Sequence, residues 1–205
     1  MQRHLVILVK APRIGAVKTR LARGVGVMAA WRFYRNTTTE VLRRLAARGA
    51  KPWRLWLAVT PDAFVTKGRF WPADLHRMGQ GRGDLGARMA KPMQDLPLGP
   101  VVVIGSDVPD ISASLIAEAF EALERADAVV GPATDGGYWL IGLRRRPVPP
   151  SRLRPGLFRH VRWSGPHALA DTLAGLDPRL TIAEITTLSD VDRAKDLAEW
   201  KKAGG

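Results

Sequence analysis

The first cluster of chemically capable residues is a basic loop that follows an apolar run near the N-terminus. It reads KAPRIGAVKTRL from Lys10 to Leu21 and holds four cations, with Gly15 in its middle. It is not a P-loop, because the earlier glycine of that motif is missing. Such a loop can neutralise a di- or triphosphate, with Arg20 as a bidentate donor, Lys18 as a point charge, and Arg13 and Gly15 beside them. A solvated turn is the alternative interpretation.

The best candidate for a metal ligand is Asp107. It follows the wholly apolar run Val101 to Gly105 in the segment Ser106-Asp107-Val108-Pro109-Asp110. A carboxylate there needs water, a donor or a cation, and hard oxygen ligands favour magnesium. An acid at a helix N-terminus is the alternative, and this suits Asp110 better, since a helix is expected to start at Ser112.

A third chemically unusual loop contains an aspartate followed by two glycines. Asp135, Gly136 and Gly137 come after the apolar run Ala128 to Gly131. Glycines let a backbone approach a ligand closely, which predicts a nucleotide contact, whereas a plain Asp-Gly hairpin turn would use the same residues.

The segment before the C-terminal helix offers two further carboxylates. Ser189-Asp190-Val191-Asp192 precedes a helix expected to run to Lys202. Ser189 and Asp192 fit a capping box with Asp in place of Glu, and a second metal contact by Asp192 is the alternative. None of the four histidines has a partner at ligand spacing, although His167 could touch an acceptor.

Composition limits which chemistry these loops can perform. There is no cysteine, so a metal would be Mg²⁺ or Mn²⁺ held by oxygen ligands. The net charge of +13 favours anionic substrates, but the arginines are spread along the chain without a stacking platform, so nucleic acid is not the expected partner. The apolar run Leu5 to Val9 is too short for a signal sequence or membrane span, which predicts a cytoplasmic protein with no membrane partner.

The elements that must position these loops alternate between strands and helices. Strands are expected at Leu5 to Val9, Trp53 to Val59, Val101 to Gly105, Ala128 to Gly131 and Tyr138 to Leu143, and helices at Val27 to Ala47, Asp84 to Leu96 and Ser112 to Arg125. The pattern predicts an α/β fold of three layers, a mostly parallel sheet with helices on both faces, in one domain over residues 1–205. Ligands bind beyond the carboxyl ends of such strands, so the three loops should share one cleft.

Three other features receive less weight. Gly81 to Gly86 matches a dinucleotide-binding pattern, but it follows the polar residues Arg77 to Gln80 rather than a first strand, which argues against nicotinamide binding. Gly49 is expected to stop the preceding helix. The run Arg144 to Arg146, before a proline-rich segment, is expected to lie in a solvated loop within Arg144 to Arg154.

Four motifs in a fixed order resemble one bacterial family. They are Lys18-Thr19-Arg20-Leu21, Gly83-Asp84-Leu85-Gly86-x-Arg88-Met89, Gly105-Ser106-Asp107-x-Pro109, and Asp135-Gly136-Gly137-Tyr138 with the apolar residues after it to Leu143. Over roughly Leu5 to Thr172 the chain is similar to the radical-SAM/selenodomain-associated transferases, which belong to the nucleotide-diphospho-sugar transferase superfamily and have a GT-A-like fold.

The resemblance implies where a nucleotide and a metal would bind. The basic loop and the region from Gly83 to Arg88, including Leu85, would hold the nucleotide, and Asp107 the metal. Relatives also carry an Asp-rich segment before the last helix, which implies a metal contact for Asp192, although Arg193-Ala194 stands here where Thr-Pro often follows. The threonine that usually follows Trp-Ser in the family is also absent after Ser164.

Two enzyme activities and one binding activity remain open. The first is nucleotidyl transfer from a nucleoside triphosphate to a small acceptor, and the second is glycosyl transfer from a nucleotide sugar. Asp107-Val108-Pro109 resembles the Asp-x-Pro of nucleotidyltransferases more than the Asp-x-Asp of sugar transferases, and a basic loop suits a triphosphate. The third is a non-catalytic anion or nucleic-acid binding protein.

Overall fold

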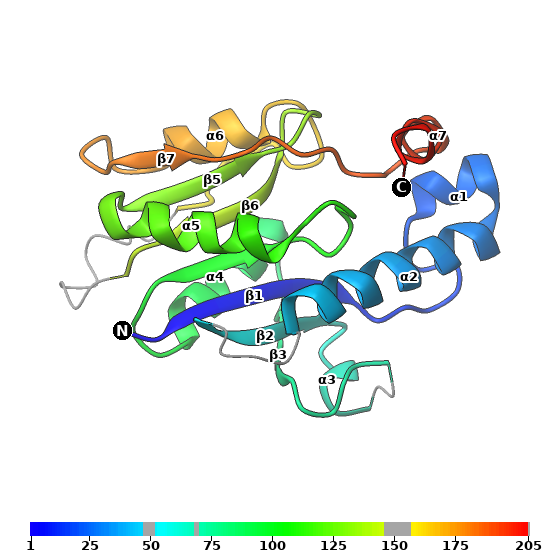
Figure 1. The fold of residues 1–205 in the computed structure, drawn as a ribbon, viewed down its shortest axis with the longest axis horizontal. Coiled ribbons are helices and arrows are strands. Elements are labelled where there is room, and N and C mark those ends of the chain that lie inside the picture. Colours follow the sequence, from blue (N-terminus) through cyan, green and yellow to red (C-terminus); the bar gives the residue numbers. More distant parts are fainter. Residues whose placement is uncertain (47–51, 68–69, 146–156, 205) are drawn as a thin grey trace.

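A computed structural model describes residues 1–46, 52–67, 70–145 and 157–204 of the chain. Its centre is a seven-stranded sheet in the order β3-β2-β1-β4-β6-β5-β7 (Figure 1). The strands are β1 (Arg3–Lys10), β2 (Trp53–Thr60), β3 (His76–Gly79), β4 (Val101–Ile104), β5 (Ala128–Pro132), β6 (Tyr138–Leu143) and β7 (Ile182–Glu184). The helices are α1 (Thr19–Val25), α2 (Val27–Ala46), α3 (Phe64–Lys67), α4 (Leu85–Asp95), α5 (Ala113–Arg125), α6 (Ala168–Ala174) and α7 (Ala194–Lys202).

The sheet is mostly parallel, with β6 as the exception. β1 pairs in parallel with both β2 and β4, whereas β6 runs antiparallel to β4 and β5. The short turn from β5 to β6 explains the reversal, because parallel neighbours need a long crossover. The predicted three-layer α/β class is confirmed.

Successive side chains along the strands point alternately into two separate hydrophobic cores. Leu5, Ile7 and Val9 of β1 pack in a cluster with buried residues of α2 and α5 on one face of the sheet. Val6 packs on the other face with Met89 of α4 and with side chains of the α6 region. Because both faces are covered, the central strands are mostly apolar along their length, and this pattern allowed them to be predicted from the sequence.

Helix ends agree with local sequence signals in some places and not in others. Ser112 is the N-cap of α5, and its side chain accepts a hydrogen bond from the Leu115 N–H, as predicted.

The edge strands β3 and β7 were not predicted, because each is short and largely polar or exposed. β3 directly precedes Gly81 to Gly86, so that glycine segment does follow a strand, although an edge strand. The expected helix stop at Gly49 lies outside the described residues.

The predicted solvated arginine run is wrong for Arg145. This side chain is buried, and its guanidinium donates to the carbonyls of Gly99, Met93, Leu96 and Pro97 at 2.7 to 3.0 Å. It therefore satisfies carbonyl groups at and beyond the C-terminal end of α4, which would otherwise lack donors. Residues 146–156 of the same expected loop lie outside the described part.

None of the helices in the described part of the chain is long and apolar enough to cross a membrane.

Candidate active site

The predicted loops meet at the carboxyl ends of the central strands. A pocket of about 500 Å³ is lined by residues 16–20 after β1, residues 105–108 after β4, and Ala133, Asp135 and Gly137 between β5 and β6. Segments around Gln80 to Met89 and Trp163 to Ala168 complete its wall. The convergence follows from strand direction, since β1, β4 and β5 all end at the same edge of the sheet.

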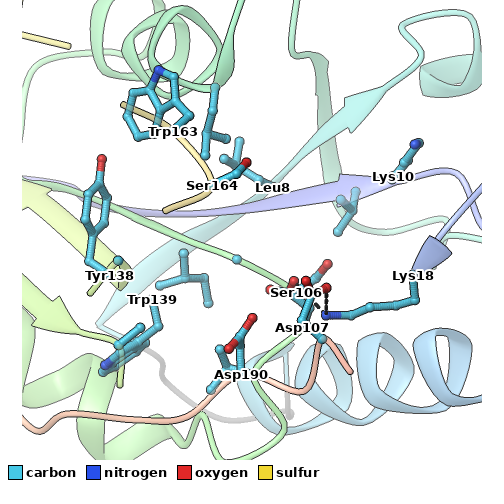
Figure 2. Close-up of a pocket in the computed structure, with 18 of the residues that line it drawn as sticks. Leu8, Lys10, Lys18, Ser106, Asp107, Tyr138, Trp139, Trp163, Ser164 and Asp190 are labelled. Atoms are coloured by element: carbon cyan, nitrogen blue, oxygen red, sulfur yellow. Dashed lines mark hydrogen bonds and ion pairs between the residues drawn. The ribbon is translucent and has the colours of Figure 1, made fainter. Parts of the chain in front are cut away.

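Lys18 is the centre of the polar end of this pocket (Figure 2). Its Nζ lies 3.0 Å from Asp107 Oδ2 and 3.5 Å from Asp192 Oδ1, and only 4% of its side chain is exposed. Burial by itself would lower the pKa of Lys18, but Asp107, Asp192 and Asp190 outweigh it, and the pKa is raised. The ammonium is therefore firmly charged.

The backbone at Lys18 is also unusual. Lys18 stands at the N-cap of α1 with φ 46° and ψ 46°, in the left-handed region that a residue with a Cβ rarely adopts. Strain of this kind persists where surrounding contacts hold the residue, and it gathers at functional sites. Here the ion pairs of the Lys18 side chain supply such contacts.

Asp190 adds a third carboxylate to the group around Lys18. The pKa of Asp190 is raised to about 6. Burial is the largest cause, the Lys18 ammonium opposes it, and the nearby charges of Asp107, Asp135 and Asp192 add to it. Asp107, Asp190 and Asp192 thus crowd negative charge around one ammonium, and we call these three residues the acidic group. The sequence showed Asp190 as one carboxylate of the Ser189 to Asp192 segment but indicated no role for it.

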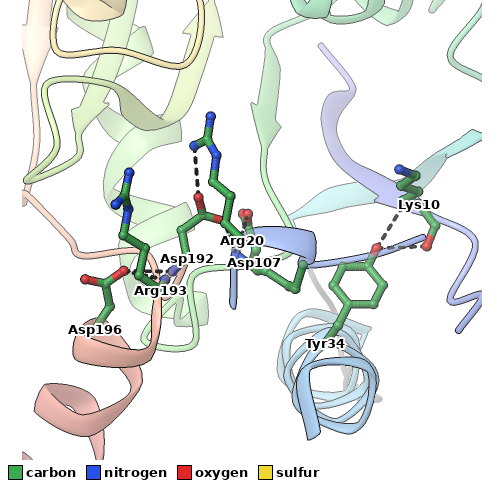
Figure 3. Close-up of polar contacts among 8 residues, drawn as sticks. Lys10, Arg20, Tyr34, Asp107, Asp192, Arg193 and Asp196 are labelled. Atoms are coloured by element: carbon green, nitrogen blue, oxygen red, sulfur yellow. Dashed lines mark hydrogen bonds and ion pairs between the residues drawn. The ribbon is translucent and has the colours of Figure 1, made fainter. Parts of the chain in front are cut away.

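Arg20 pairs with the same segment from the rim. Its Nη1 lies 3.0 Å from Asp192 Oδ2, with about half of the arginine side chain exposed (Figure 3). The pair of Arg20 with Asp192 links residues 172 positions apart in the sequence.

The predicted capping box at Ser189 and Asp192 is wrong. Helix α7 begins later, at Ala194, and Asp196 accepts from the backbone N–H groups of Asp192 and Arg193 at 3.1 and 2.7 Å. Ser189 instead accepts a hydrogen bond from Thr134 at 3.1 Å. Since Asp196 performs the capping, the Asp192 carboxylate is free to reach Lys18 and Arg20.

Metal binding by Asp107 and Asp192 stays a prediction. Within the described residues no group of three or more His, Cys, Asp or Glu side chains is arranged to hold a metal. The donor set nonetheless suits a hard cation, because the acidic group consists of carboxylates, and within the described ranges its ion pairs are made with Lys18 and Arg20.

Other residues expected to bind a nucleotide divide into two groups. Leu85, Asp135 and Gly137 line the pocket. Asp135 Oδ1 accepts from the Gly137 N–H at 2.9 Å within the turn between β5 and β6, as in the Asp-Gly hairpin that was the alternative interpretation. The remaining residues are not among those lining it: Arg13, Gly15, Gly83, Arg88 and Gly136.

The expected nucleotide-binding residues that do not line the pocket have structural roles. Arg13 lies over the ring of Phe64, and Arg88 donates to the Gly83 carbonyl at 3.2 Å. Gly15, Gly83 and Gly136 have φ of 74°, 108° and 85°, which explains glycine at these turns. His167 is exposed at the start of α6 and does not line the pocket.

Several residues that line the pocket were not picked out in the sequence. Tyr34 of α2 accepts from the Lys10 N–H and donates to the Lys10 carbonyl, both at 2.8 Å (Figure 3). Gln80 is buried and donates to the carbonyls of Val9 and Ala58. One feature of the sequence could have identified Tyr34, because it is an aromatic residue with a polar group on the apolar face of a predicted helix. No such feature marks Gln80, which lies in a glycine-rich segment.

Comparison with known proteins adds a family and a fold. Residues 41–165, more than half of the chain, match the family model described as "Uncharacterized protein conserved in bacteria (DUF2064)". No curated protein matches the sequence significantly. The chain is similar to a candidate nucleotide-diphospho-sugar transferase from Desulfovibrio desulfuricans G20, with 31% identity, a TM-score of 0.83, and coverage of 100% of this chain and 88% of that one.

Two more distant structures share the fold. The first is CMP:2-keto-3-deoxy-manno-octonic acid synthetase complexed with CTP, with 12% identity, a TM-score of 0.56, and coverage of 100% and 98% of the two chains. The second is Rv0371c of Mycobacterium tuberculosis H37Rv in complex with manganese, with 16% identity, a TM-score of 0.52, and coverage of 99% and 100%. The chain therefore has the fold of nucleotide-diphospho-sugar transferases and nucleotidyltransferases.

Proposed function

This chain belongs to the DUF2064 family, and from that premise we propose that it is a metal-dependent nucleotidyltransferase. It would bind a nucleoside triphosphate and transfer the nucleotidyl group to a small acceptor, with release of pyrophosphate. The observation that carries the proposal is the meeting of Lys18 with the acidic group at the strand ends, inside a pocket large enough for a nucleotide.

The acidic group is the proposed site of Mg²⁺ or Mn²⁺, with Asp107 and Asp192 as ligands and Asp190 beside them. A bound divalent ion would supply Lewis-acid polarisation of phosphate oxygens. Two relatives of the fold support this choice, since one is described with CTP and the other with manganese.

The chain's own cations have the remaining part in the proposed reaction. An acceptor oxygen attacks the α-phosphorus, the bond to the bridging oxygen breaks, and the pyrophosphate leaves with the extra negative charge. Lys18 and Arg20 lie on the pocket wall, where they can bind phosphate oxygens and stabilise that charge as it develops. Asp107 and Asp192 hold both cations in place before the substrate arrives.

Glycosyl transfer from a nucleotide sugar is the second candidate, because the same fold and phosphate grip would serve it. It would release a nucleoside diphosphate instead of pyrophosphate. The Asp107-Val108-Pro109 segment and the paired cations favour the triphosphate. A non-catalytic anion-binding protein would need no metal and would lose affinity steeply with salt.

The test is a Mn²⁺ titration of nucleotide binding, followed by product analysis. Asp107→Asn should lose Mn²⁺-dependent binding, because an amide lacks the charge that a hard cation requires. Asp110→Asn is the matched control, since Asp110 accepts from Trp200 at 3.3 Å and does not line the pocket. Unchanged Mn²⁺ dependence in Asp107→Asn would refute the metal site. Pyrophosphate among the products identifies nucleotidyl transfer, and a nucleoside diphosphate identifies glycosyl transfer.

A further inference from the structure

The end of the pocket away from Lys10 and Lys18 is formed by aromatic side chains. Figure 2 shows Trp163 and Tyr138 on one side of the pocket, with Lys10 and Lys18 on the other. The two rings meet edge to face, with centroids 6.5 Å apart and an interplanar angle of 66°. Leu85 and Met89 line the pocket with them. We call Trp163 and Tyr138 the aromatic corner.

The polar atoms of the aromatic corner are already used by the protein. Trp163 Nε1 donates to Asp84 Oδ2 at 3.3 Å. The Tyr138 hydroxyl contacts Met89 Sδ at 3.9 Å and accepts from Thr172 Oγ1 at 3.3 Å. Burial also raises the pKa of Tyr138, so the phenol stays neutral. What the corner offers a ligand is therefore the faces and edges of its rings.

The indole of Trp163 is held against the protein from behind. Its ring centroid lies 6.2 Å from that of Phe158, and Gly86 lies so close that an added Cβ would be 2.9 Å from the indole and 2.4 Å from Phe158 Cβ. With its edge fixed by Asp84, the indole is a preorganised surface, and a ligand would not have to order it on binding.

Charge at this end disfavours an anion. The cations among the described residues that line the pocket are Lys10, Lys18 and Arg20, and all three belong to β1 or to the loop and helix after it. Asp84 touches the aromatic corner directly and carries a carboxylate. A phosphate would thus be attracted to the far end and repelled here.

We propose that the aromatic corner is the subsite for an uncharged ring of the substrate, which binds by stacking on Trp163 while the phosphates lie toward Lys18 and Arg20. This inference rests on the proposed function and specifies the chemistry of one end of its site. A nucleobase and the CH-rich face of a cyclic acceptor such as a pyranose share this chemistry, since both offer a flat or apolar face to an indole.

Binding measurements on Trp163→Leu, Trp163→Phe and Trp200→Leu test the proposal. Trp200 is the matched control, because its Nε1 also donates to an aspartate at 3.3 Å and it does not line the pocket. The probes are inorganic tripolyphosphate with Mn²⁺, the four common nucleoside triphosphates with Mn²⁺, and methyl glucopyranoside. Tripolyphosphate carries the anion without a ring.

We expect Trp163→Leu to bind tripolyphosphate as the parent does and to lose about tenfold or more in affinity for one class of ring ligand. Trp163→Phe should restore most of that affinity, and Trp200→Leu should not change it. A loss confined to the nucleoside triphosphates assigns the corner to the base, and a loss confined to the glucopyranoside assigns it to the acceptor.

Two results would overturn the inference: unchanged affinity of Trp163→Leu for every ring ligand, or a parent that binds no ring ligand. If Trp163→Leu does not fold, ligand-induced quenching of indole fluorescence that is as large in Trp163→Phe as in the parent would also overturn it. Failure of the proposed function looks different, because the parent would then bind neither tripolyphosphate nor nucleotide with Mn²⁺, whatever Trp163 does with the glucopyranoside.

Discussion

At the scale of single residues, the site depends on one ammonium that balances several carboxylates. Lys18 is nearly fully buried, and breaking a buried pair by removing one partner leaves uncompensated charge. The acidic group tolerates this crowding only while Lys18, or a cation in its place, is present.

Lys18→Met should therefore lower the free energy of unfolding by about 1–3 kcal/mol, measured by urea denaturation at neutral pH, because the acidic group loses its buried counter-ion. Adding Mn²⁺ should raise the Tm of this variant by more than it raises the Tm of the parent. Lys195→Met, at an exposed position on α7, is the control and should match the parent. A variant as stable as the parent would show that the ion pairs contribute nothing net.

At the scale of elements, the helices on both faces of the sheet hold in place the loops that follow the strands. Tyr34 of α2 links its helix to the end of β1, because its hydroxyl makes hydrogen bonds to both the N–H and the carbonyl of Lys10. The strand that leads into the Lys18 loop is thus tied to α2 through one phenol.

Tyr34→Phe should cost about 1–2 kcal/mol of stability, because the Lys10 N–H and carbonyl lose their buried partner. Nucleotide affinity should fall as well, since the end of β1, which leads into the Lys18 loop, loses its anchor to α2. Urea denaturation and isothermal calorimetry measure the two effects. Parent-like values for both would mean that packing of the ring alone positions the end of β1.

The close packing of α4 against the segment before α6 leads to a second prediction at the scale of elements. A Cβ on Gly86 would clash with Phe158 and Trp163, whereas a Cβ on Gly165 would meet no heavy atom within 4 Å. Gly86→Ala should therefore destabilise the protein by about 1–3 kcal/mol, and Gly165→Ala should be close to neutral in thermal denaturation. Equal effects of the two substitutions would contradict the packing described for Trp163.

At the scale of the whole molecule, the end of the sheet opposite the pocket contains a buried titratable group. His4 at the start of β1 is fully buried, and its Nδ1 accepts from Trp56 Nε1 at 3.3 Å. Burial lowers the pKa of His4, and the positive charges of Arg145 and Arg54 lower it further. The folded protein therefore resists protonation of this imidazole.

Acid should destabilise the fold through His4. Because its pKa is lower in the folded state, its contribution to stability is present above the unfolded pKa of about 6.5 and is lost as the pH falls toward the folded value. Urea denaturation of His4→Asn should vary less between pH 7 and pH 5 than that of the parent, while His167→Asn, at an exposed position, should follow the parent. An unchanged pH dependence in His4→Asn would exclude this imidazole as its source.

The sequence by itself determined the fold class and the place of the site. Apolar runs of strand length that alternate with segments of helical periodicity fold in few ways other than as a sheet covered by helices on both faces. Because the strands β1 and β4 are parallel, the loops that follow them then lie at the same edge of the sheet. Asp107 could be selected because a carboxylate directly after a buried strand is costly without a partner, and Lys18 and Arg20 because they belong to a basic loop beyond the first strand. That residues 1–205 form one domain stays a prediction.

Only the tertiary structure decided which distant side chains complete the pocket. Asp192 reaches Lys18 and Arg20 because α7 packs beside α1 (Figure 1), where Gly24 leaves room that a Cβ would fill at 2.6 Å from Ala194. Tyr34 and Trp163 enter in the same way, through contacts across layers of the fold. Local patterns report the period and the ends of an element, but the direction in which a side chain points across an interface depends on packing between segments far apart in the chain.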